Sequence, residues 1–193
     1  MAIEKSDIKK NGTNGNGNSK NKDLKDSKVD KIPVVPQEVK DWKHLQGIIR
    51  HVDNVRAGAK LLAERLFEQG DSSMARLLVQ KVSSHDASKF VGIEWEHLRV
   101  GNDTSEEFKM ALVQHQLTNE HHPEHWGGVK NMPEICLAEM VCDFYARSVE
   151  FGTDLRVYIK DVFMPQHDCT LKTKVYQQIK RFVDLMLEEP FTK

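Results

Sequence analysis

Apolar side chains recur at steps of three and four residues along most of the chain, and this spacing restricts the possible folds more than any other feature. The longest run comprises Leu45, Ile48, Ile49, Val52, Val55, Ala59, Leu62 and Leu66. Such a period places its members on one face of an α-helix, which must then pack against neighbours. No segment shows the strict alternation that is typical of a half-buried strand. We therefore predict an all-α fold, a compact bundle of about six to seven helices.

Glycine, proline and capping residues divide this pattern into segments. Gly70 can end the first helix, and Asp71 can cap the second. Pro123, Gly127 and Gly128 predict a loop in the second half of the chain. The predicted elements are a helix from Gln37, a second helix up to Val82, two short helices at Val91–Arg99 and Thr104–Leu117, a loop at Asn119–Met132, a helix at Pro133–Val149, a segment at Asp154–Phe163, and a last helix with an apolar face from Leu171 to Met186.

The first 36 residues differ in composition from the rest of the chain. The stretch from Asn11 to Lys20 is of low complexity and rich in Asn and Gly, and Lys and Asp follow it. Such a segment buries too little apolar surface to offset the entropy of ordering. We predict a disordered tail over residues 1–36 and a single helical domain over residues 37–193.

Length, charge and cysteine content restrict the class of protein. The chain has 193 residues, of which 39% are hydrophobic, enough for one soluble domain with a core. A formal net charge of -1 gives no electrostatic basis for binding a nucleic-acid duplex or a membrane surface. No apolar run approaches the roughly 20 residues that span a bilayer. Three cysteines without a CxxC pair indicate small core residues in a reducing compartment, so we predict a cytoplasmic protein.

Histidines and aspartates occur in an order that is typical of a metal site built by several helices. In chain order these residues are His51, His85-Asp86, His121-His122 and Asp143. Imidazole and carboxylate ligands suit a divalent transition metal, and ligands from separate helices can form one site. The ligand types do not distinguish manganese, iron, cobalt, nickel and zinc.

Two of these residues have ordinary structural alternatives. His51 lies at the margin of the apolar face of the first helix and is expected to point inward, where a hydrogen-bonded core histidine is the other interpretation. Asp143 has apolar neighbours on its helix, and an unpaired carboxylate there would be costly. Either a metal ion or Arg147, four residues further on, can offset that cost.

The doublet His85-Asp86 can bind one metal ion only under a geometric condition. Adjacent side chains within a helix diverge by about 100°. They can converge if the doublet lies at a helix end. Lys89 follows Asp86 by three residues, so its ammonium group can lie on the same side and attract a phosphate oxygen. A surface ion pair between Asp86 and Lys89 is the alternative.

A histidine-rich stretch provides further candidate ligands. Four of the nine histidines fall within eleven residues: His115, His121, His122 and His125. Pro123 disfavours helical geometry at His122, so a loop can turn these rings inward. We predict His115 and His122 as ligands, His121 beside the reacting group, and His125 and Trp126 at the rim of a substrate site. Solvent-exposed loop histidines are the alternative.

Taken together, these residues resemble the HD-domain superfamily of metal-dependent phosphohydrolases, over roughly Trp42 to Asp184. Three motifs are similar to those of a branch of this superfamily that is found in phage and bacteria. They are His85-Asp86-Ala87-Ser88-Lys89-Phe90, His121-His122-Pro123-Glu124-His125-Trp126 and Glu139-Met140-Val141-Cys142-Asp143. The resemblance implies an all-α core and a metal ion held by His51, His85, Asp86 and Asp143.

The resemblance also implies an activity, the hydrolysis of a nucleotide or another small phosphate ester by metal-activated water. It suggests Asp86, Lys89 and His121 as catalytic residues, and Lys89, His125, Trp126 and Arg147 as substrate contacts. His115 and His121 are only six residues apart, whereas members with two metals place these ligands on separate helices. We therefore expect one ion rather than two. The alternatives are a di-iron oxygenase and a non-catalytic helical module with a structural or vestigial metal site; a homodimer remains an option.

Overall fold

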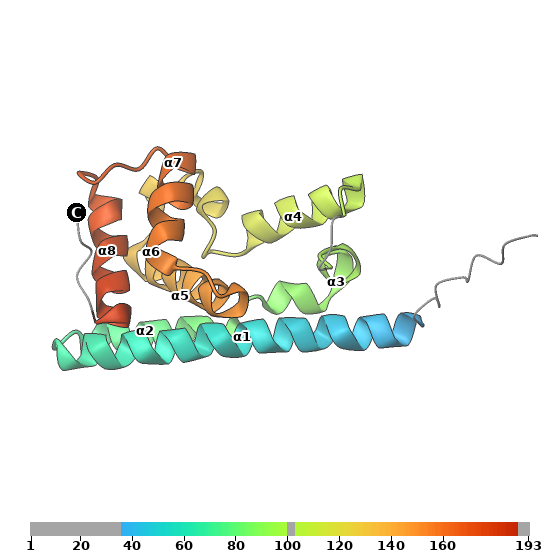
Figure 1. Cartoon of the computed structure of the whole chain (residues 1–193), viewed down its shortest axis with the longest axis horizontal. Helices are drawn as coiled ribbons and strands as arrows, with labels where there is room; N and C mark the ends of the chain where they lie inside the picture. The colour runs from blue at the N-terminus through green and yellow to red at the C-terminus, as the bar shows by residue number, and fades with distance from the viewer. Residues whose placement is uncertain (1–35, 100–102, 189–193) are drawn as a thin grey trace, which may run out of the picture. The chain divides into compact units, whose positions relative to one another are not determined.

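The long apolar stripe forms one continuous helix, α1 (Gln37–Glu68), which packs mainly against α2 (Ser72–Lys81), α5 (Glu134–Phe151) and α8 (Lys174–Leu187) (Figure 1). The computed structural model describes residues 36–99 and 103–188, so the predicted tail lies outside the described residues except for Pro36. Val55, Ala59, Leu62 and Leu66 are buried, as the spacing predicts. Ile49, which was assigned to the same face, is 43% exposed instead.

A tight turn after α1 returns the chain along it as α2 (Ser72–Lys81). Gly70 occupies the left-handed region at φ 84°, where a glycine has no Cβ clash. The Asp71 side chain accepts a hydrogen bond from the backbone N–H of Met74 and caps α2, as predicted. After Lys81 the helix tightens into a 3-10 turn, Val82–Ser84, and then ends.

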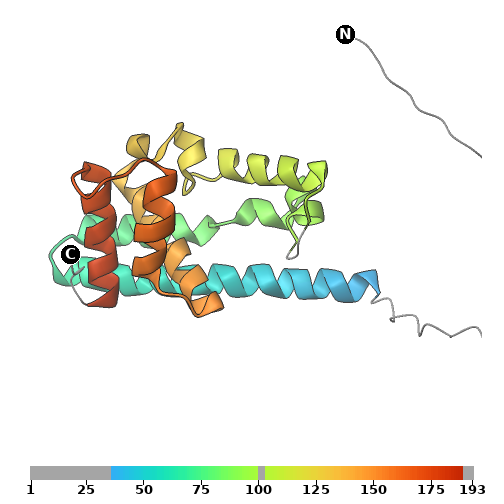
Figure 2. The same cartoon turned by 45° about the horizontal axis from the view of Figure 1, so that its top comes forward.

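Two shorter helices follow and lie against each other, α3 (Gly92–His97) and α4 (Glu106–Thr118) (Figure 2). Another 3-10 turn, Ala87–Phe90, precedes α3. The His44 ring of α1 contacts Trp95 of α3, with centroids 4.9 Å apart and ring planes tilted by 47°. The predicted loop after α4 holds two more 3-10 turns, Pro123–Trp126 and Val129–Asn131.

The central helix is α5 (Glu134–Phe151), which packs on α1, α2 and α8. Pro133 is its N-cap rather than part of the first turn. The segment predicted at Asp154–Phe163 is one continuous helical stretch of α6 (Leu155–Tyr158), a π-helical turn (Ile159–Phe163) and α7 (Met164–Gln166).

The last helix, α8 (Lys174–Leu187), buries the predicted apolar face from Val175 to Met186. Leu171 was wrongly assigned to that face: it precedes α8 and is 56% exposed. The reason is local, because Thr173 caps α8 by accepting from the backbone N–H of Tyr176 and so sets the start of the helix. The all-α prediction is confirmed: residues 36–99 and 103–188 contain no strand and seven helices, counting α6 to α7 as one.

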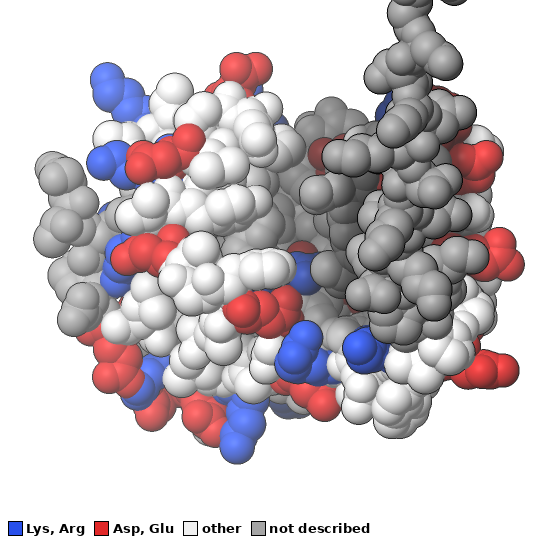
Figure 3. All heavy atoms as spheres, turned by 45° about the vertical axis from the view of Figure 1, so that its right-hand side comes forward, with Lys and Arg blue, Asp and Glu red and all other residues white. Residues whose placement is uncertain are grey.

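The apolar core lies where α1, α2, α5 and α8 meet, and it includes the three cysteines, all of them buried and free. Within the described part of the chain, no helix has the length and apolar character needed to cross a membrane. Figure 3 shows acidic and basic side chains interspersed over the described part of one face, without a field of one sign.

Candidate metal centre

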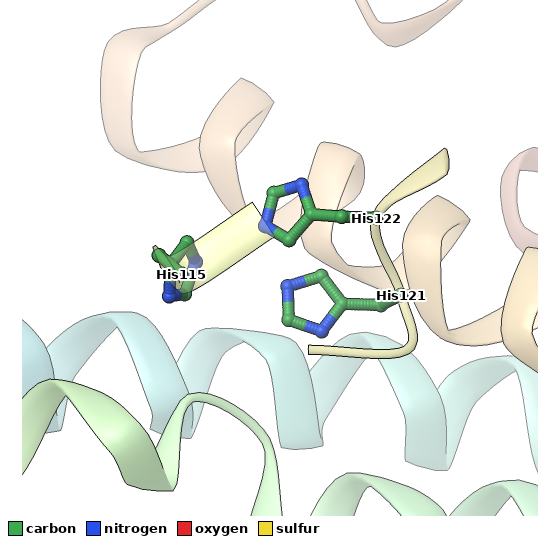
Figure 4. Close-up of side chains that lie close together, drawn as sticks. All are labelled: His115, His121 and His122. Atoms are coloured by element: carbon green, nitrogen blue, oxygen red, sulfur yellow. The ribbon is translucent and has the colours of Figure 1, made fainter. Parts of the chain in front are cut away.

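The candidate ligands come from five separate segments that meet beside the apolar core. His51 lies in α1 and Asp143 in α5, while His115 lies in the last turn of α4. The other members of the group are His85 and Asp86 after α2 and His121 and His122 in the loop after α4. Figure 4 shows the rings of His121 and His122 extending from that loop toward His115. The fold therefore assembles every ligand that the sequence proposed.

The backbone at the doublet explains how two adjacent side chains converge. His85 is extended, at φ -52° and ψ 130°, and Asp86 is left-handed, at φ 58° and ψ 20°. Aspartate is one of the few residues that visits this region readily. The condition that the doublet lies at a helix end is thus met. As a result the Asp86 carboxylate is fully buried among the histidines.

The two carboxylate oxygens of Asp86 face different histidines. Its Oδ2 lies 3.4 Å from Nε2 of His51 and 3.6 Å from Nε2 of His85. Its Oδ1 lies 3.4 Å from Nε2 of His115 and 3.6 Å from Nε2 of His121. Asp86 therefore stands between two groups of imidazoles, with one oxygen toward each.

These groups define two donor sets. The first set is His51, His85 and Asp143, and the second set is His115, His121 and His122; in each set the ligand atoms lie within 4.8 Å of one another. Asp143 joins the first set through its Oδ1, which is 3.0 Å from Nε2 of His51. The chain turns after α4 and brings His115 and His121 into one set despite their short spacing, and the number of ions stays a prediction.

Several of these donor atoms are buried without a hydrogen-bond partner. They are Nε2 of His51, His85, His121 and His122, and Oδ1 of Asp86 and of Asp143. A buried polar atom without a partner costs about 1–3 kcal/mol. Imidazole lone pairs that face carboxylate oxygens across 3 to 4 Å also repel each other unless a proton or a metal ion lies between them. The donor sets therefore fit a metal ion, and buried His/Asp groups of this chain can hold one.

Three glutamates that the sequence reasoning did not select contact the outer nitrogens of the rings. Glu150 lies 2.9 Å from Nδ1 of His51, and Glu139 lies 3.0 Å from Nδ1 of His85. Glu94, which is fully buried, lies 2.8 Å from Nδ1 of His115. A carboxylate at Nδ1 holds the proton there and leaves Nε2 free to bind a metal, the usual arrangement around metal-bound histidines.

The comparison with known families covers nearly the whole helical domain. A family model described as "Family of unknown function (DUF5662)" matches residues 40–187, which include every member of both donor sets. The chain belongs to the DUF5662 family. No curated protein and no solved structure matches it.

Charges and burial in this DUF5662 chain set the protonation of the ligands. Burial lowers the pKa of His122 to about 4, lowers that of His121 well below the ordinary value, and lowers that of His115. The second set is therefore neutral at pH 7, the form that binds metals. Burial alone would raise the pKa of Asp86, but the charges of Lys89 and His85 hold it well below the ordinary value.

The first set differs from the second, because it contains an imidazole whose pKa is raised. Burial would lower the pKa of His85, but a hydrogen bond with Glu139 and the charges of Asp86 and Asp143 raise it above the usual 6.5. Burial likewise acts to raise the pKa of Asp143, yet its 3.0 Å contact with His51 and the charges of His85 and His121 keep it well below the ordinary value. A proton therefore competes with a metal ion more strongly at His85 than at the histidines of the second set.

Two basic residues of the DUF5662 site lie at the edge of the ligand group. Lys89 Nζ is 2.5 Å from Asp86 Oδ2, so the ion pair predicted as an alternative does form, although it is largely buried rather than on the surface. Arg147 Nε is 3.9 Å from Asp143 Oδ1, and its Nη1 donates to Glu150 at 3.1 Å. Arg147 is thus a weak partner for Asp143 and half exposed.

The two proposed rim residues are engaged elsewhere. His125 is exposed, and its Nδ1–H donates to the backbone carbonyl of Leu117 at 2.7 Å. Trp126 packs against the apolar core and donates from Nε1 to the carbonyl of Glu120 at 2.9 Å. The 3-10 turn at Pro123 directs both side chains onto the loop itself, and their role as substrate contacts stays a prediction.

Proposed function

We propose that this chain is a metal-dependent phosphohydrolase that acts on a nucleotide or another small phosphate ester. The observation that carries the proposal is the position of Asp86, whose two oxygens face two groups of imidazole nitrogens. Three of these four nitrogens, Nε2 of His51, His85 and His121, have no hydrogen-bond partner. That arrangement supports two divalent transition-metal ions, which would be held by the two donor sets and Asp86, rather than the single ion expected from spacing. The order of the ligands along the chain also resembles the HD-domain superfamily, which supports the same class of reaction.

A divalent cation bound by these donors supplies Lewis acidity toward a phosphoryl oxygen and toward water. The residues of the chain supply the rest. Lys89 lies within an ion pair of Asp86 and provides positive charge beside the reacting phosphoryl group. The Asp86 carboxylate would help to hold the cation and, with Lys89, orient water beside it. Arg147 is half exposed at the edge, where its guanidinium can bind a phosphate oxygen that arrives from solvent.

The proposed setting follows from the same features. Free, buried cysteines suit a reducing compartment, so we place the activity in the cytoplasm. The formal net charge is -1, and acidic and basic side chains are mixed on the described part of the face in Figure 3. We therefore propose a small phosphorylated molecule as the partner, acted on by a monomer or a homodimer.

Metal analysis combined with a phosphate-release screen tests this proposal. The purified chain is freed of metal with a chelator and refilled separately with Mn²⁺, Fe²⁺, Co²⁺, Ni²⁺ and Zn²⁺. We expect binding of a metal and release of phosphate from at least one nucleotide or sugar phosphate. Asp86→Ala should abolish the release, and unchanged release in that variant would point to a contaminating hydrolase. Unchanged metal content in His85→Ala would contradict the metal centre itself.

The same experiment separates a second candidate, a di-iron oxygenase. Two donor sets on either side of one carboxylate fit two iron ions as well. This candidate predicts two irons per chain and oxygen consumption with an organic substrate, without phosphate release. Metal binding with neither activity would instead support a structural metal site.

A further inference from the structure

Each of the three glutamates beside the candidate ligands contacts a different part of the two donor sets. Of the six members of the two sets, Glu150 contacts His51 alone, which belongs to the first set. Glu94 contacts His115 alone among them, which belongs to the second set. These two carboxylates therefore each serve a single set.

Glu139 is different, because it contacts one imidazole of each set. Its Oε1 lies 3.0 Å from Nδ1 of His85 and 3.7 Å from Nδ1 of His121. The rings of His85 and His121 are tilted by 37° with centroids 4.2 Å apart, so the same oxygen is hydrogen-bonded to His85 and lies within ion-pair distance of His121. Glu139 is thus a contact between the two sets on the side opposite to Asp86.

Other side chains fix these three carboxylates in place. Lys81 lies 3.6 Å from Oε2 of Glu139 and is itself paired with Glu120 at 2.5 Å. Ser88 donates to Glu94 at 2.8 Å, and Asn54 donates to Glu150 at 3.2 Å. A carboxylate held from behind in this way can fix the orientation of an imidazole rather than follow it.

We propose that Glu139 is a positioning residue that couples the two metal sites, whereas Glu150 and Glu94 each position the ligands of one site. The inference rests on the proposed metal centre and concerns how its ligands are held. A carboxylate at Nδ1 fixes the tautomer and raises the basicity of Nε2, and its loss typically lowers metal affinity by a factor of about 10–100. Glu139 acts on one ring in each set, so its loss must weaken both sites together.

Titration of the metal-free, full-length chain with Co²⁺ tests this assignment. Binding is followed by calorimetry and by the visible absorption of bound Co²⁺, which reports the coordination geometry. Substitution of glutamate by glutamine keeps the shape and one acceptor oxygen but removes the charge. We expect Glu150→Gln to weaken one binding step about tenfold and Glu94→Gln to weaken the other step by a similar factor.

The decisive variant is Glu139→Gln, which should weaken both steps and shift both Co²⁺ spectra, like the double variant of Glu150 and Glu94. The matched control is Glu134→Gln, at the start of the same helix, where the side chain pairs with Arg181 away from the ligands. This control should leave both steps unchanged. A loss of general stability alone would lower the melting temperature without altering the Co²⁺ spectra.

The possible outcomes separate this inference from the proposed function. If the wild-type chain binds no Co²⁺, the metal centre itself fails. If the wild type binds two ions and Glu139→Gln weakens only one step or neither, the coupling role is overturned and the metal centre is not. The same holds if the wild type binds a single ion. If Glu139→Gln does not fold, Lys81→Met takes its place, because it leaves Glu139 present but unanchored. Weakening of both steps in that variant supports the proposal, and any other pattern overturns it.

Discussion

The apolar core and the ligand cluster share two helices, α1 and α5, but they are stabilised in different ways. On α5, Met140 and Val141 enter the apolar core, while their neighbours Glu139 and Asp143 face the histidines. On α1, Val55 is fully buried in the core one turn after His51. The core needs no ligand, because its apolar side chains are packed against one another.

The ligand cluster, in contrast, contains buried polar atoms that have no partner. Four of its imidazole nitrogens and two of its carboxylate oxygens lack hydrogen-bond partners. The chain therefore uses the free energy of its apolar core to hold a group of polar atoms that would be more stable in water. This difference indicates that the core determines whether the domain folds, and that the cluster serves binding rather than stability.

The largest expected effect comes from the apolar core. Phe182 of α8 is fully buried, and Phe182→Ala should lower the free energy of unfolding by about 3–5 kcal/mol. Chemical denaturation with and without added Co²⁺ measures this change. The loss should be the same in both conditions, because Phe182 lies outside the ligand cluster. Phe67→Ala is the matched control, since Phe67 is 63% exposed and should change stability little. A loss that depended on the metal would mean that core and cluster are not separate.

The sequence predicts the core better than the cluster for a physical reason. Helix periodicity is a local property, so the spacing of Val55, Ala59 and Leu62 was enough to identify the buried face. The predicted buried face was wrong where a helix cap, rather than the spacing of apolar residues, determines where a helix begins. Leu171 has the right spacing for α8, yet the cap at Thr173 excludes it from the helix.

In the cluster, the ligand types were recognisable but their partners were not. Asp143 stood out because an unpaired carboxylate is costly among apolar neighbours, and His51 and His85-Asp86 stood out because their types and order are typical of metal ligands. The glutamate contacts depend on tertiary structure: Glu94 lies in a six-residue helix too short to show a period. Only α5 carried a usable signal, since Glu139, Asp143 and Glu150 share one helical face.

The second expected effect is a dependence of stability on pH in the metal-free chain. The pKa of His122 is lowered by burial to about 4 from an ordinary 6.5, so the unfolded chain binds its proton first as the pH falls. The contribution of the neutral His122 ring to the stability of the folded chain is therefore fully present above pH 6.5. It is lost as the pH falls from 6.5 to 4. It should amount to about 2 kcal/mol, allowing for partial exposure of the ring.

Comparison with His122→Gln isolates this effect, because glutamine does not titrate. Denaturation of both chelator-treated proteins at several pH values between 7 and 4 provides the measurement. The wild type should lose more stability on acidification than the variant. The pKa of His85 is raised and opposes the trend equally in both proteins. Parallel curves for the two proteins would contradict the neutral state assigned to His122.

The smallest expected effect is a gain in stability when one ligand is replaced by an apolar residue. Nε2 of His121 is buried without a partner, and Glu139 keeps its contacts with His85 and Lys81 when the His121 ring is removed. His121→Leu should therefore stabilise the metal-free chain by about 1 kcal/mol while it weakens metal binding. Thermal denaturation in chelator, paired with Co²⁺ titration, measures both. His125→Leu is the control and should give no gain, because that ring is exposed and donates to Leu117. If His121→Leu instead destabilised the metal-free chain, the cluster would be part of the stabilising core, and the distinction between the two regions would not hold.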